Sequence, residues 1–313
     1  MKIAVTGASG YLGGRLIKYF ASNKSYEIIA TSRQILNYKL PISSIKINWE
    51  DDDSISALCQ NTDVIIHLAS KNEQDSENNY QSTLLENGLA GLKLIEAAEN
   101  ASVRRFIYMS SIKVFGGHKY GPIKEDTLAQ PQSSYGITHK LVEDYLLAKH
   151  RKRTIEGVVL RLSNAVGVPY KSTNNMWALI ANDFCRQAAM TGEITLNSPG
   201  HTWRNFIAIT DIEKAFDTVL HAPAKSLEDG LFNLGSTNSM RIIDLAKIIA
   251  TRAELIWQRK IKLNHPQPNS NTRPTGLDWN IDKLSSLGWQ PGKNALIEEI
   301  DNTLKFCSRH FRS

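Results

Sequence analysis

Cysteine is scarce in this sequence of 313 residues, which contains three. Cys59, Cys185 and Cys307 lie far apart in the chain, and none belongs to a C-x-x-C motif. A disulfide framework needs paired cysteines, and a zinc site of the finger or ribbon type needs closely spaced ones. The sequence indicates neither, so we expect no metal site and a reducing, cytoplasmic environment.

Long apolar runs are also missing. A membrane-spanning helix needs about 18 consecutive apolar residues, whereas the longest apolar runs here, such as residues 63–68, have the length of a single strand. The chain leads from Met1 directly into Ile3-Ala4-Val5, with no basic segment, apolar segment or cleavage site before them. We therefore expect a cytoplasmic protein without a membrane anchor or an export signal.

Charge of one sign is in only slight excess, with 37 basic against 31 acidic residues and a net charge of +6. Part of the excess lies in the run Lys149-His150-Arg151-Lys152-Arg153, which follows a segment of helical periodicity. Cations at the carboxyl end of a helix interact favourably with its dipole. We therefore expect no nucleic-acid partner, and the excess charge fits anionic small molecules better.

Strand-like apolar runs alternate with helix-period segments through the first half of the chain. This alternation predicts a Rossmann-like doubly wound α/β fold, in which helices cover both faces of a parallel sheet. The strands are expected at residues 2–6, 27–31, 44–47, 64–68, 105–109 and 157–160, and the helices at residues 10–21, 53–59, 80–99 and 134–150.

The pattern changes after Asn164, because glycine, proline and asparagine interrupt shorter segments. A strand at residues 204–209 and a helix at 211–220 are expected to return to the sheet, and its last strand is expected at 231–234. The sequence thus predicts an NAD(P)-binding Rossmann domain and a smaller C-terminal α/β substrate lobe. The first comprises residues 1–165 plus 204–237, and the second comprises residues 166–203 plus 238–313.

The first predicted strand leads into a G-x-x-G-x-x-G turn that opens a helix. In dinucleotide-binding folds such glycines permit a tight turn, close approach of the backbone to a pyrophosphate, and packing of the helix on the strand. The amino terminus of the helix also attracts the anion. This position between strand and helix predicts a nicotinamide dinucleotide site, whose contacts are Gly7, Gly10, Tyr11, Leu12 and Gly13.

The second predicted strand ends at Ser32-Arg33, with no carboxylate where NAD sites usually bind the adenosine ribose. An arginine there can pair with the 2′-phosphate of NADPH, and the serine can donate a hydrogen bond to it. The sequence therefore favours NADP(H) over NAD(H), with a surface arginine unrelated to the cofactor as the alternative. The other predicted cofactor contacts follow the third and fourth strands and are Asn48, Leu68 and Ala69.

Several ordered motifs extend over nearly the whole chain. They are the glycine turn, His67-Leu68-Ala69, Asn87 with Gly91, Ser110-Ser111-Ile112-Lys113-Val114-Phe115-Gly116, Tyr135-Gly136, Leu160-Arg161-Leu162-Ser163-Asn164, Arg204-Asn205-Phe206-Ile207 with Asp211, Phe232-Asn233-Leu234-Gly235, and Arg273 followed by Leu287-Gly288-Trp289. In these motifs the sequence resembles the extended short-chain dehydrogenase/reductase family, in its nucleotide-sugar epimerase, dehydratase and reductase branch. The resemblance implies an NAD(P)-dependent enzyme that acts on a nucleotide-diphosphate sugar.

The resemblance implies that Ser111 and Tyr135 are the catalytic hydroxyls, with Tyr135 giving or taking the proton that accompanies hydride transfer. The family has a lysine four residues after the tyrosine, where this chain has His139, and Lys140 lies a further 100° around the helix. The lysine charge lowers the pKa of the phenol, whereas a histidine with an ordinary pKa of about 6.5 is mostly neutral at pH 7. His139 is therefore expected to bind the cofactor and to help Tyr135 less, which favours ketone reduction by a protonated phenol.

The predicted substrate residues are also implied by the resemblance. Asn164, Arg204 and Arg273 match family residues that bind the nucleotide diphosphate, and Ser111 is expected to contact the reacting sugar oxygen. Guanidinium groups suit this role because they form forked hydrogen bonds with phosphate oxygens. Residues 172–177 and 196–203 are expected to meet the base and the sugar, with no indication of which sugar is bound.

Dehydratases of this family carry an acidic pair directly after the catalytic serine or threonine, and here these positions are Ile112 and Lys113. Two redox activities remain: reduction of a 4-keto sugar by NADPH, which we favour, and 4-epimerisation with retained NAD. A non-catalytic protein that senses NADPH is a third alternative. The segment 110–114 is similar to some reductases of O-antigen sugar assembly, which implies polysaccharide biosynthesis. A homodimer is expected through the helices at 80–99 and 134–150.

Overall fold

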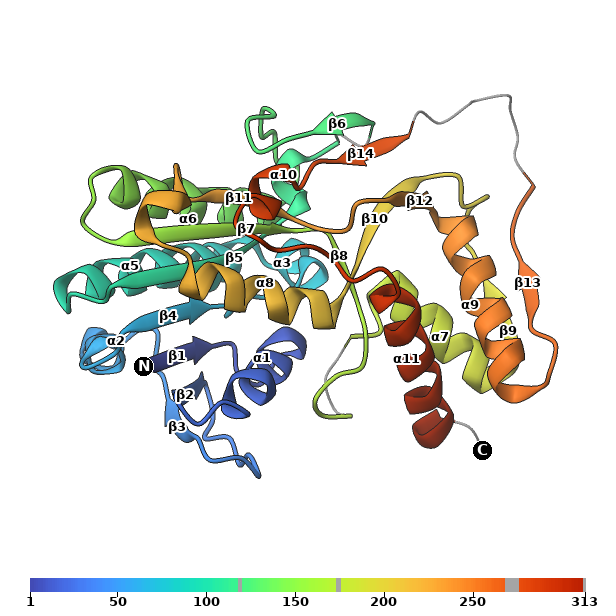
Figure 1. The fold of residues 1–313 in the computed structure, drawn as a ribbon, viewed down its shortest axis with the longest axis horizontal. Helices are drawn as coiled ribbons and strands as arrows, with labels where there is room; N and C mark the ends of the chain where they lie inside the picture. Colours follow the sequence, from blue (N-terminus) through green and yellow to red (C-terminus); the bar gives the residue numbers. More distant parts are fainter. Residues whose placement is uncertain (118–119, 173–175, 268–275, 312–313) are drawn as a thin grey trace. The chain divides into compact units, whose positions relative to one another are not determined.

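The computed structural model describes residues 1–117, 120–172, 176–267 and 276–311. Within them, a seven-stranded sheet has the order β11-β7-β5-β4-β1-β2-β3 (Figure 1). The neighbouring pairs from β7 to β3 run parallel, so the predicted Rossmann-like doubly wound fold is confirmed. The strands are β1 (Lys2–Thr6), β2 (Glu27–Ser32), β3 (Ser43–Lys46), β4 (Val64–His67), β5 (Arg105–Ser111), β7 (Glu156–Leu162) and β11 (Leu231–Leu234).

The central strands β1 and β4 are almost entirely buried, as expected for parallel strands that helices cover on both faces. On one face, a core cluster joins Ile65 and Phe106 of the strands to Leu94, Val142 and Leu146 of the covering helices. The helical segments of this part of the chain are α1 (Tyr11–Ala21), α2 (Asp52–Cys59), α3 (Glu73–Asn78), α4 (Tyr80–Thr83), η1 (Leu84–Leu89), α5 (Ala90–Asn100), η2 (Ile112–Phe115), α6 (Ser134–Arg151), α8 (Ile209–His221) and η3 (Ala224–Leu227).

The order of the strands reverses between β1 and β4, since β2 and β3 lie on one side of this pair and β5, β7 and β11 on the other. In open α/β sheets ligands bind outside the carboxyl ends of the strands at such a reversal. The carboxyl end of β1 is the glycine turn, and that of β4 leads into Leu68-Ala69. The topology therefore places two of the predicted cofactor segments at the expected edge of the sheet.

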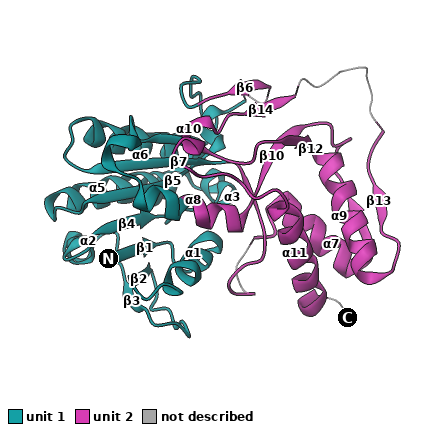
Figure 2. Ribbon diagram, in the orientation of Figure 1, with its two compact units in different colours: residues 1–118, 125–162, 216–232 teal, residues 119–124, 163–215, 233–313 magenta. Residues whose placement is uncertain are grey.

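The chain divides into two compact units (Figure 2). Unit 1 comprises residues 1–118, 125–162 and 216–232, and unit 2 comprises residues 119–124, 163–215 and 233–313. The division expected from the sequence differs at residues 119–124, 163–165, 204–215 and 233–237, which were expected in the Rossmann domain and belong to unit 2.

Unit 2 has its own core, in which α7, α9 and α11 pack together around Phe184, Leu245 and Leu304. The expectation that residues 204–209 return to the main sheet is wrong, because this strand lies between β8 and β12 in a separate three-stranded sheet. A hydrophobic pattern predicts a strand but does not name its neighbours. The elements of unit 2 are β6 (Gly121–Ile123), β8 (Asn164–Val166), α7 (Ile180–Thr191), β9 (Glu193–Thr195), β10 (Trp203–Ala208), β12 (Ser239–Arg241), α9 (Ile242–Trp257), β13 (Lys262–Asn264), β14 (Leu277–Trp279), α10 (Asp282–Ser285) and α11 (Ala295–Phe311).

The helix expected at residues 80–99 is observed as α4, η1 and α5 in succession. The middle part, η1, is a turn of π-helix, and the backbone N–H of Ala90 donates to the carbonyl of Leu85 five residues before it. Single π-turns inside helices often occur at functional sites. This irregularity has no signature in the hydrophobic periodicity on which the sequence prediction was based.

No helix in the described parts of the chain combines the length and the apolar character needed to cross a membrane. Cys59, Cys185 and Cys307 are buried free thiols. Among the described residues, no three His, Cys, Asp or Glu side chains are grouped so as to hold a metal ion.

Candidate active site

The glycine turn joins β1 to α1 in a tightly packed conformation. Gly7 has a φ of 67°, which favours glycine, and its carbonyl oxygen accepts the N–H of Gly10 at 2.9 Å. A Cβ added at Gly13 would lie 2.2 Å from that same oxygen, so only glycine fits there. Gly10 has no side chain to cap α1, so an anion such as a pyrophosphate can accept from the N–H groups of its first turn.

The segment after β4 is tied to the glycine turn by Thr6, the last residue of β1. Its Oγ1 accepts the backbone N–H groups of Leu68 and Ala69, each at 3.2 Å. A Cβ on Gly7 would lie 2.8 Å from the N of Ala69. Leu68 and Ala69, both predicted to contact the cofactor, therefore lie directly beside the glycine turn.

The carboxyl end of β2 carries Ser32 and Arg33. The Ser32 hydroxyl is engaged locally, because it donates to the carbonyl of Gln34 and accepts its N–H. The Arg33 side chain is 77% exposed, and its Nη1 lies 3.3 Å from Oε2 of Glu86. Asn48, predicted to reach the adenine, is exposed and accepts the N–H of Glu50 through its side chain.

Ser111 and Tyr135, the predicted catalytic hydroxyls, are hydrogen-bonded to each other. Ser111 ends β5, and Tyr135 lies in the first turn of α6, which begins after the capping residue Ser133. A Cβ on Gly136 would lie 2.6 Å from the carbonyl oxygen of Lys113, so the close approach of α6 to η2 requires glycine. This approach brings the two hydroxyls together.

The phenol of Tyr135 has a pKa raised to about 12. Burial is the main cause, the hydrogen bond with Ser111 acts in the opposite direction, and the charge of Glu73 adds to the increase. Glu73 forms an ion pair with Lys113, with 2.7 Å between its Oε1 and the lysine Nζ. Tyr135 is therefore a protonated phenol throughout the physiological pH range.

His139 lies beside Tyr135, with 4.3 Å between the ring centroids in an edge-on arrangement. Its Nδ1 is 2.6 Å from the hydroxyl of Tyr108, whereas its buried Nε2 has no hydrogen-bond partner among the described residues. Burial, with a further contribution from His67, lowers the pKa of His139 to about 3. The residue in the place of the family lysine is therefore a neutral imidazole.

The column of rings continues from His139 to β1. Tyr108 stacks on His67, with 5.7 Å between centroids, and the Nδ1 of His67 is 2.8 Å from Oγ1 of Thr6. Burial lowers the pKa of His67 to about 4, so this ring is also neutral. Thr6 thus links the glycine turn to Tyr135 through three stacked or hydrogen-bonded rings.

Lys140 does not take the place of the family lysine. Its Nζ is paired with the carboxylate of Asp144, one turn further along α6. Such i,i+4 pairs are ordinary features of a helix surface. The expectation from helical geometry, that Lys140 points away from the tyrosine, agrees with this pairing.

A buried polar network next to the predicted catalytic pair was missed by the sequence reasoning. The Ser110 hydroxyl donates to Oε1 of Glu143 at 2.5 Å, and the Arg161 guanidinium donates to both oxygens of the same carboxylate, at 3.0 and 2.8 Å. Arg161 also covers the ring of Phe115 at 4.7 Å. The available signal was the spacing of His139 and Glu143 by four residues, which places both on one face of α6.

The predicted diphosphate-binding residues that the structure describes lie in unit 2, whereas Ser111, expected to contact the sugar, lies in unit 1. The side-chain amide of Asn164 donates to the carbonyl of Asn205 at 2.8 Å, from β8 to β10. Arg204 is partly exposed in β10 and forms part of the small sheet opposite Met240. Arg273, the third predicted diphosphate ligand, lies outside the described residues.

The model of the NAD dependent epimerase/dehydratase family matches residues 3–235. The chain belongs to this family. The resemblance to extended short-chain dehydrogenase/reductases is thereby confirmed, and the protein is an enzyme of that family.

Two characterised relatives match almost the whole chain. The dTDP-D-glucose 4,6-dehydratase of Homo sapiens is 24% identical, over 100% of this chain and 91% of that protein. The dTDP-4-dehydro-6-deoxyglucose reductase of Escherichia coli is 25% identical, over 97% of this chain and 96% of that protein. The two identities are nearly equal, although the names of the two relatives give different reactions.

Solved structures agree with the fold. The UDP-glucuronic acid 4-epimerase of Bacillus cereus in complex with NAD has a TM-score of 0.81, with 23% identity over 100% of both chains. RMD of Pseudomonas aeruginosa complexed with NADPH has a TM-score of 0.78, with 20% identity over 98% of this chain and 99% of that one. Relatives of this fold thus bind either nicotinamide nucleotide.

Proposed function

We propose that the protein reduces the 4-keto group of a nucleotide-diphosphate sugar with NADPH. The observation that carries the proposal is the neutral His139 beside a protonated Tyr135, whose pKa is about 12. A protonated phenol is the starting state needed to donate a proton to a carbonyl oxygen. For the oxidation of an alcohol the same residue would first have to lose its proton.

The residues of unit 1 fit a nicotinamide dinucleotide, because the glycine turn leaves an uncapped helix terminus and the Nε2 of His139 lacks a partner in the described residues. When bound, NADPH supplies the hydride that is added to the carbonyl carbon. We assign the pyrophosphate to residues 7–13, the adenosine end to Ser32, Arg33 and Asn48, and the nicotinamide end to Leu68, Ala69, Tyr135 and His139.

In this mechanism the Ser111 hydroxyl donates a hydrogen bond to the carbonyl oxygen of the sugar and orients it. Tyr135 transfers its phenolic proton to that oxygen, which becomes the hydroxyl of the alcohol, while NADPH would supply the hydride to the carbon. The phenolate then regains a proton from water. Asn164, Arg204 and Arg273 are proposed to bind the diphosphate, which would give unit 2 the role of substrate lobe and unit 1 that of cofactor domain.

Elimination of water is not part of this proposal. The positions after Ser111 hold Ile112 and Lys113, and the Lys113 Nζ is neutralised by Glu73 at 2.7 Å. A dehydratase of this family would need an acidic pair at these two positions. The similarity in sequence to a dehydratase is therefore taken to indicate the shared family and not this reaction.

A second candidate function is 4-epimerisation with retained NAD. The contact of Arg33 with Glu86 favours it, because a carboxylate near the end of β2 can accept hydrogen bonds from the ribose hydroxyls of NAD. A purely sensory protein is a poorer candidate, since it would not need the hydrogen-bonded pair of Ser111 and Tyr135.

Release of the nucleotide from the purified protein separates the first two candidates. We expect a protein without stoichiometric NAD that oxidises NADPH when given a 4-keto nucleotide sugar. Stoichiometric NAD with interconversion of 4-epimers would refute the reductase. Tyr135→Phe should abolish turnover with little change in the Kd of NADPH, and Tyr120→Phe, at an exposed tyrosine, should leave both unchanged. Turnover that survives Tyr135→Phe would refute the proposed proton donor.

We also propose that the protein is a homodimer through α4, η1, α5 and α6. α6 contacts the other three segments, and a group of large apolar side chains on these elements is exposed: Tyr80, Leu84, Leu85, Leu89, Ile137 and Leu141. Exposed apolar groups of this kind commonly mark an interface. Light scattering should give a mass near twice 35.0 kDa, and Leu85→Glu with Ile137→Glu should give a monomer.

A further inference from the structure

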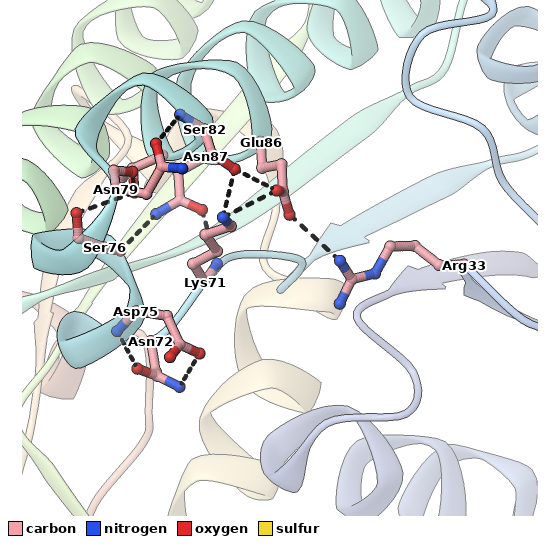
Figure 3. Close-up of polar contacts among 10 residues, drawn as sticks. Arg33, Lys71, Asn72, Asp75, Ser76, Asn79, Ser82, Glu86 and Asn87 are labelled. Carbon is pink, nitrogen blue, oxygen red and sulfur yellow. Dashed lines mark hydrogen bonds and ion pairs between the residues drawn. The ribbon is translucent and has the colours of Figure 1, made fainter.

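Arg33, the residue from which NADPH binding was predicted, is paired with a carboxylate that the sequence reasoning overlooked. Figure 3 shows Glu86 between Arg33 and Lys71. Its Oε2 is 3.3 Å from Nη1 of Arg33, and its Oε1 is 3.0 Å from Nζ of Lys71. The three charges come from different elements: the end of β2, the segment after β4, and η1.

Glu86 is held in this position by more than its two cations. The Ser82 hydroxyl donates to Oε1 at 2.7 Å from one turn earlier. Partial burial raises the pKa of Glu86, but the contacts with Ser82, Lys71 and Arg33 outweigh it, so the pKa is lowered. The carboxylate is thus ionised and fixed in place, whereas Arg33 has 77% of its side chain exposed and can move.

Two successive residues of the π-turn η1, Glu86 and Asn87, contact the same segment, at Lys71. Glu86 contacts the Nζ of Lys71, and the side-chain oxygen of Asn87 accepts the backbone N–H of Lys71 at 2.7 Å. Asn87 is buried, and its amide also reaches the hydroxyl of Ser76 at 3.4 Å. Successive residues of an α-helix point 100° apart, so the wider turn helps both to face one short segment (Figure 3).

A backbone hydrogen bond joins the end of β2, where Arg33 lies, to the glycine turn. The N–H of Ala8 donates to the carbonyl of Thr31 at 3.1 Å, two residues before Arg33. In dinucleotide-binding folds this end of the second strand meets the adenosine ribose, where a carboxylate accepts from the 2′-hydroxyl and an arginine pairs with a 2′-phosphate. This chain has both groups there, and they neutralise each other.

We propose that Glu86 determines how strongly the protein distinguishes NADPH from NADH, by competing with the 2′-phosphate for Arg33. This inference rests on the proposed nicotinamide site. NADPH binds when Arg33 exchanges the Glu86 carboxylate for the phosphate. With NADH, Arg33 stays on Glu86. The wild type is therefore expected to bind both nucleotides, with a preference for NADPH of less than about tenfold.

The experiment measures the Kd of NADPH and of NADH by fluorescence titration of the full-length protein and its variants. Glu86→Gln keeps the shape of the side chain and removes its charge, so the NADPH preference should rise at least tenfold, mainly through tighter NADPH binding. Glu86→Asp withdraws the carboxylate from Arg33 and should give a smaller rise. Glu27→Gln, which removes the partner of Lys2 at the opposite end of β2, should leave the preference unchanged.

The Arg33→Met variant tests whether Glu86 changes the NADPH preference by way of Arg33. There the preference for NADPH should be lost, and adding Glu86→Gln should then change it less than twofold. A preference that stays constant in Glu86→Gln and Glu86→Asp while both nucleotides bind would overturn this inference alone. Failure of the wild type to bind either nucleotide would overturn the proposed function as well.

Discussion

Replacing His139 by lysine should convert the phenol of Tyr135 into a group that titrates nearer neutrality. The two rings are 4.3 Å apart, so a lysine cation at this position would lie about 5 Å from the phenolic oxygen. At an effective dielectric constant of about 20 it would stabilise the phenolate by roughly 3 kcal/mol. That is equivalent to about two pKa units, which would bring the pKa of Tyr135 from about 12 to about 10.

The substitution should affect the oxidation and the reduction differently. At pH 8 the ionised fraction of the phenol would rise from about 10⁻⁴ to about 10⁻², so oxidation of the alcohol with NADP⁺ should become up to roughly a hundredfold faster in His139→Lys. Ketone reduction should change little at pH 8 and decline only near the new pKa. His139→Gln, which is neutral, is the control and should keep the wild-type pH profile.

The assay is the pH dependence of kcat in both directions, together with the absorbance of tyrosinate, for which each variant is compared with its Tyr135→Phe counterpart. A wild type whose ketone reduction already falls off near pH 7 would refute the reasoning, because it would show that something other than position 139 lowers the pKa. Equal profiles for the lysine and glutamine variants would refute it too.

Three further outcomes are expected. The pKa of His139 is about 3 in the folded protein and about 6.5 in the unfolded chain, so its contribution to stability is complete above pH 6.5 and declines as the pH falls towards 3. Urea unfolding should therefore show a loss of roughly 2 kcal/mol between pH 7 and pH 5. The His139→Gln variant should lose that much less over the same range. Gly13→Ala should abolish nucleotide binding and lower the free energy of unfolding by about 1–3 kcal/mol, because its Cβ would lie 2.2 Å from a carbonyl oxygen. The control Gly276→Ala places a Cβ with nothing within 4 Å and should be neutral in both assays. Arg161→Met leaves the carboxylate of Glu143 buried without its cation and should lower the free energy of unfolding in urea by about 3–5 kcal/mol. Much of this loss should be recovered when Glu143→Leu is added. Equal stability of the single and double variants would contradict a paired charge at this site.

Local signals in the sequence were sufficient for much of the fold, whereas Ser111 and Tyr135 were singled out by the resemblance to the family. The glycine turn and its flanking strand and helix are all read within one short segment. The predicted last strand, at residues 231–234, coincides with β11 (Leu231–Leu234). The alternation of strands and helices also predicts a parallel sheet, because neighbouring parallel strands need a crossover between them.

What the sequence missed depends on contacts between distant residues. The Arg33–Glu86 pair is separated by 53 residues and arises where the end of a strand meets a π-turn. The partner of Arg161 is 18 residues away on α6, and the sheet that β10 joins is decided by packing within unit 2. Periodicity describes one element at a time, so it contains no information on these pairings.

With the nucleotide bound as proposed, the neutral imidazole of His139 would also affect its redox strength. A cation beside the nicotinamide would disfavour the oxidised ring, which is itself positively charged, and would make the bound couple a better oxidant. At about 5 Å this amounts to roughly 3 kcal/mol, or on the order of 60 mV for a two-electron couple. With the nicotinamide at its proposed position, the uncharged His139 leaves the midpoint potential lower by that amount than a lysine would. Bound NADPH is thereby a stronger hydride donor, so the substitution that weakens the base strengthens the reductant.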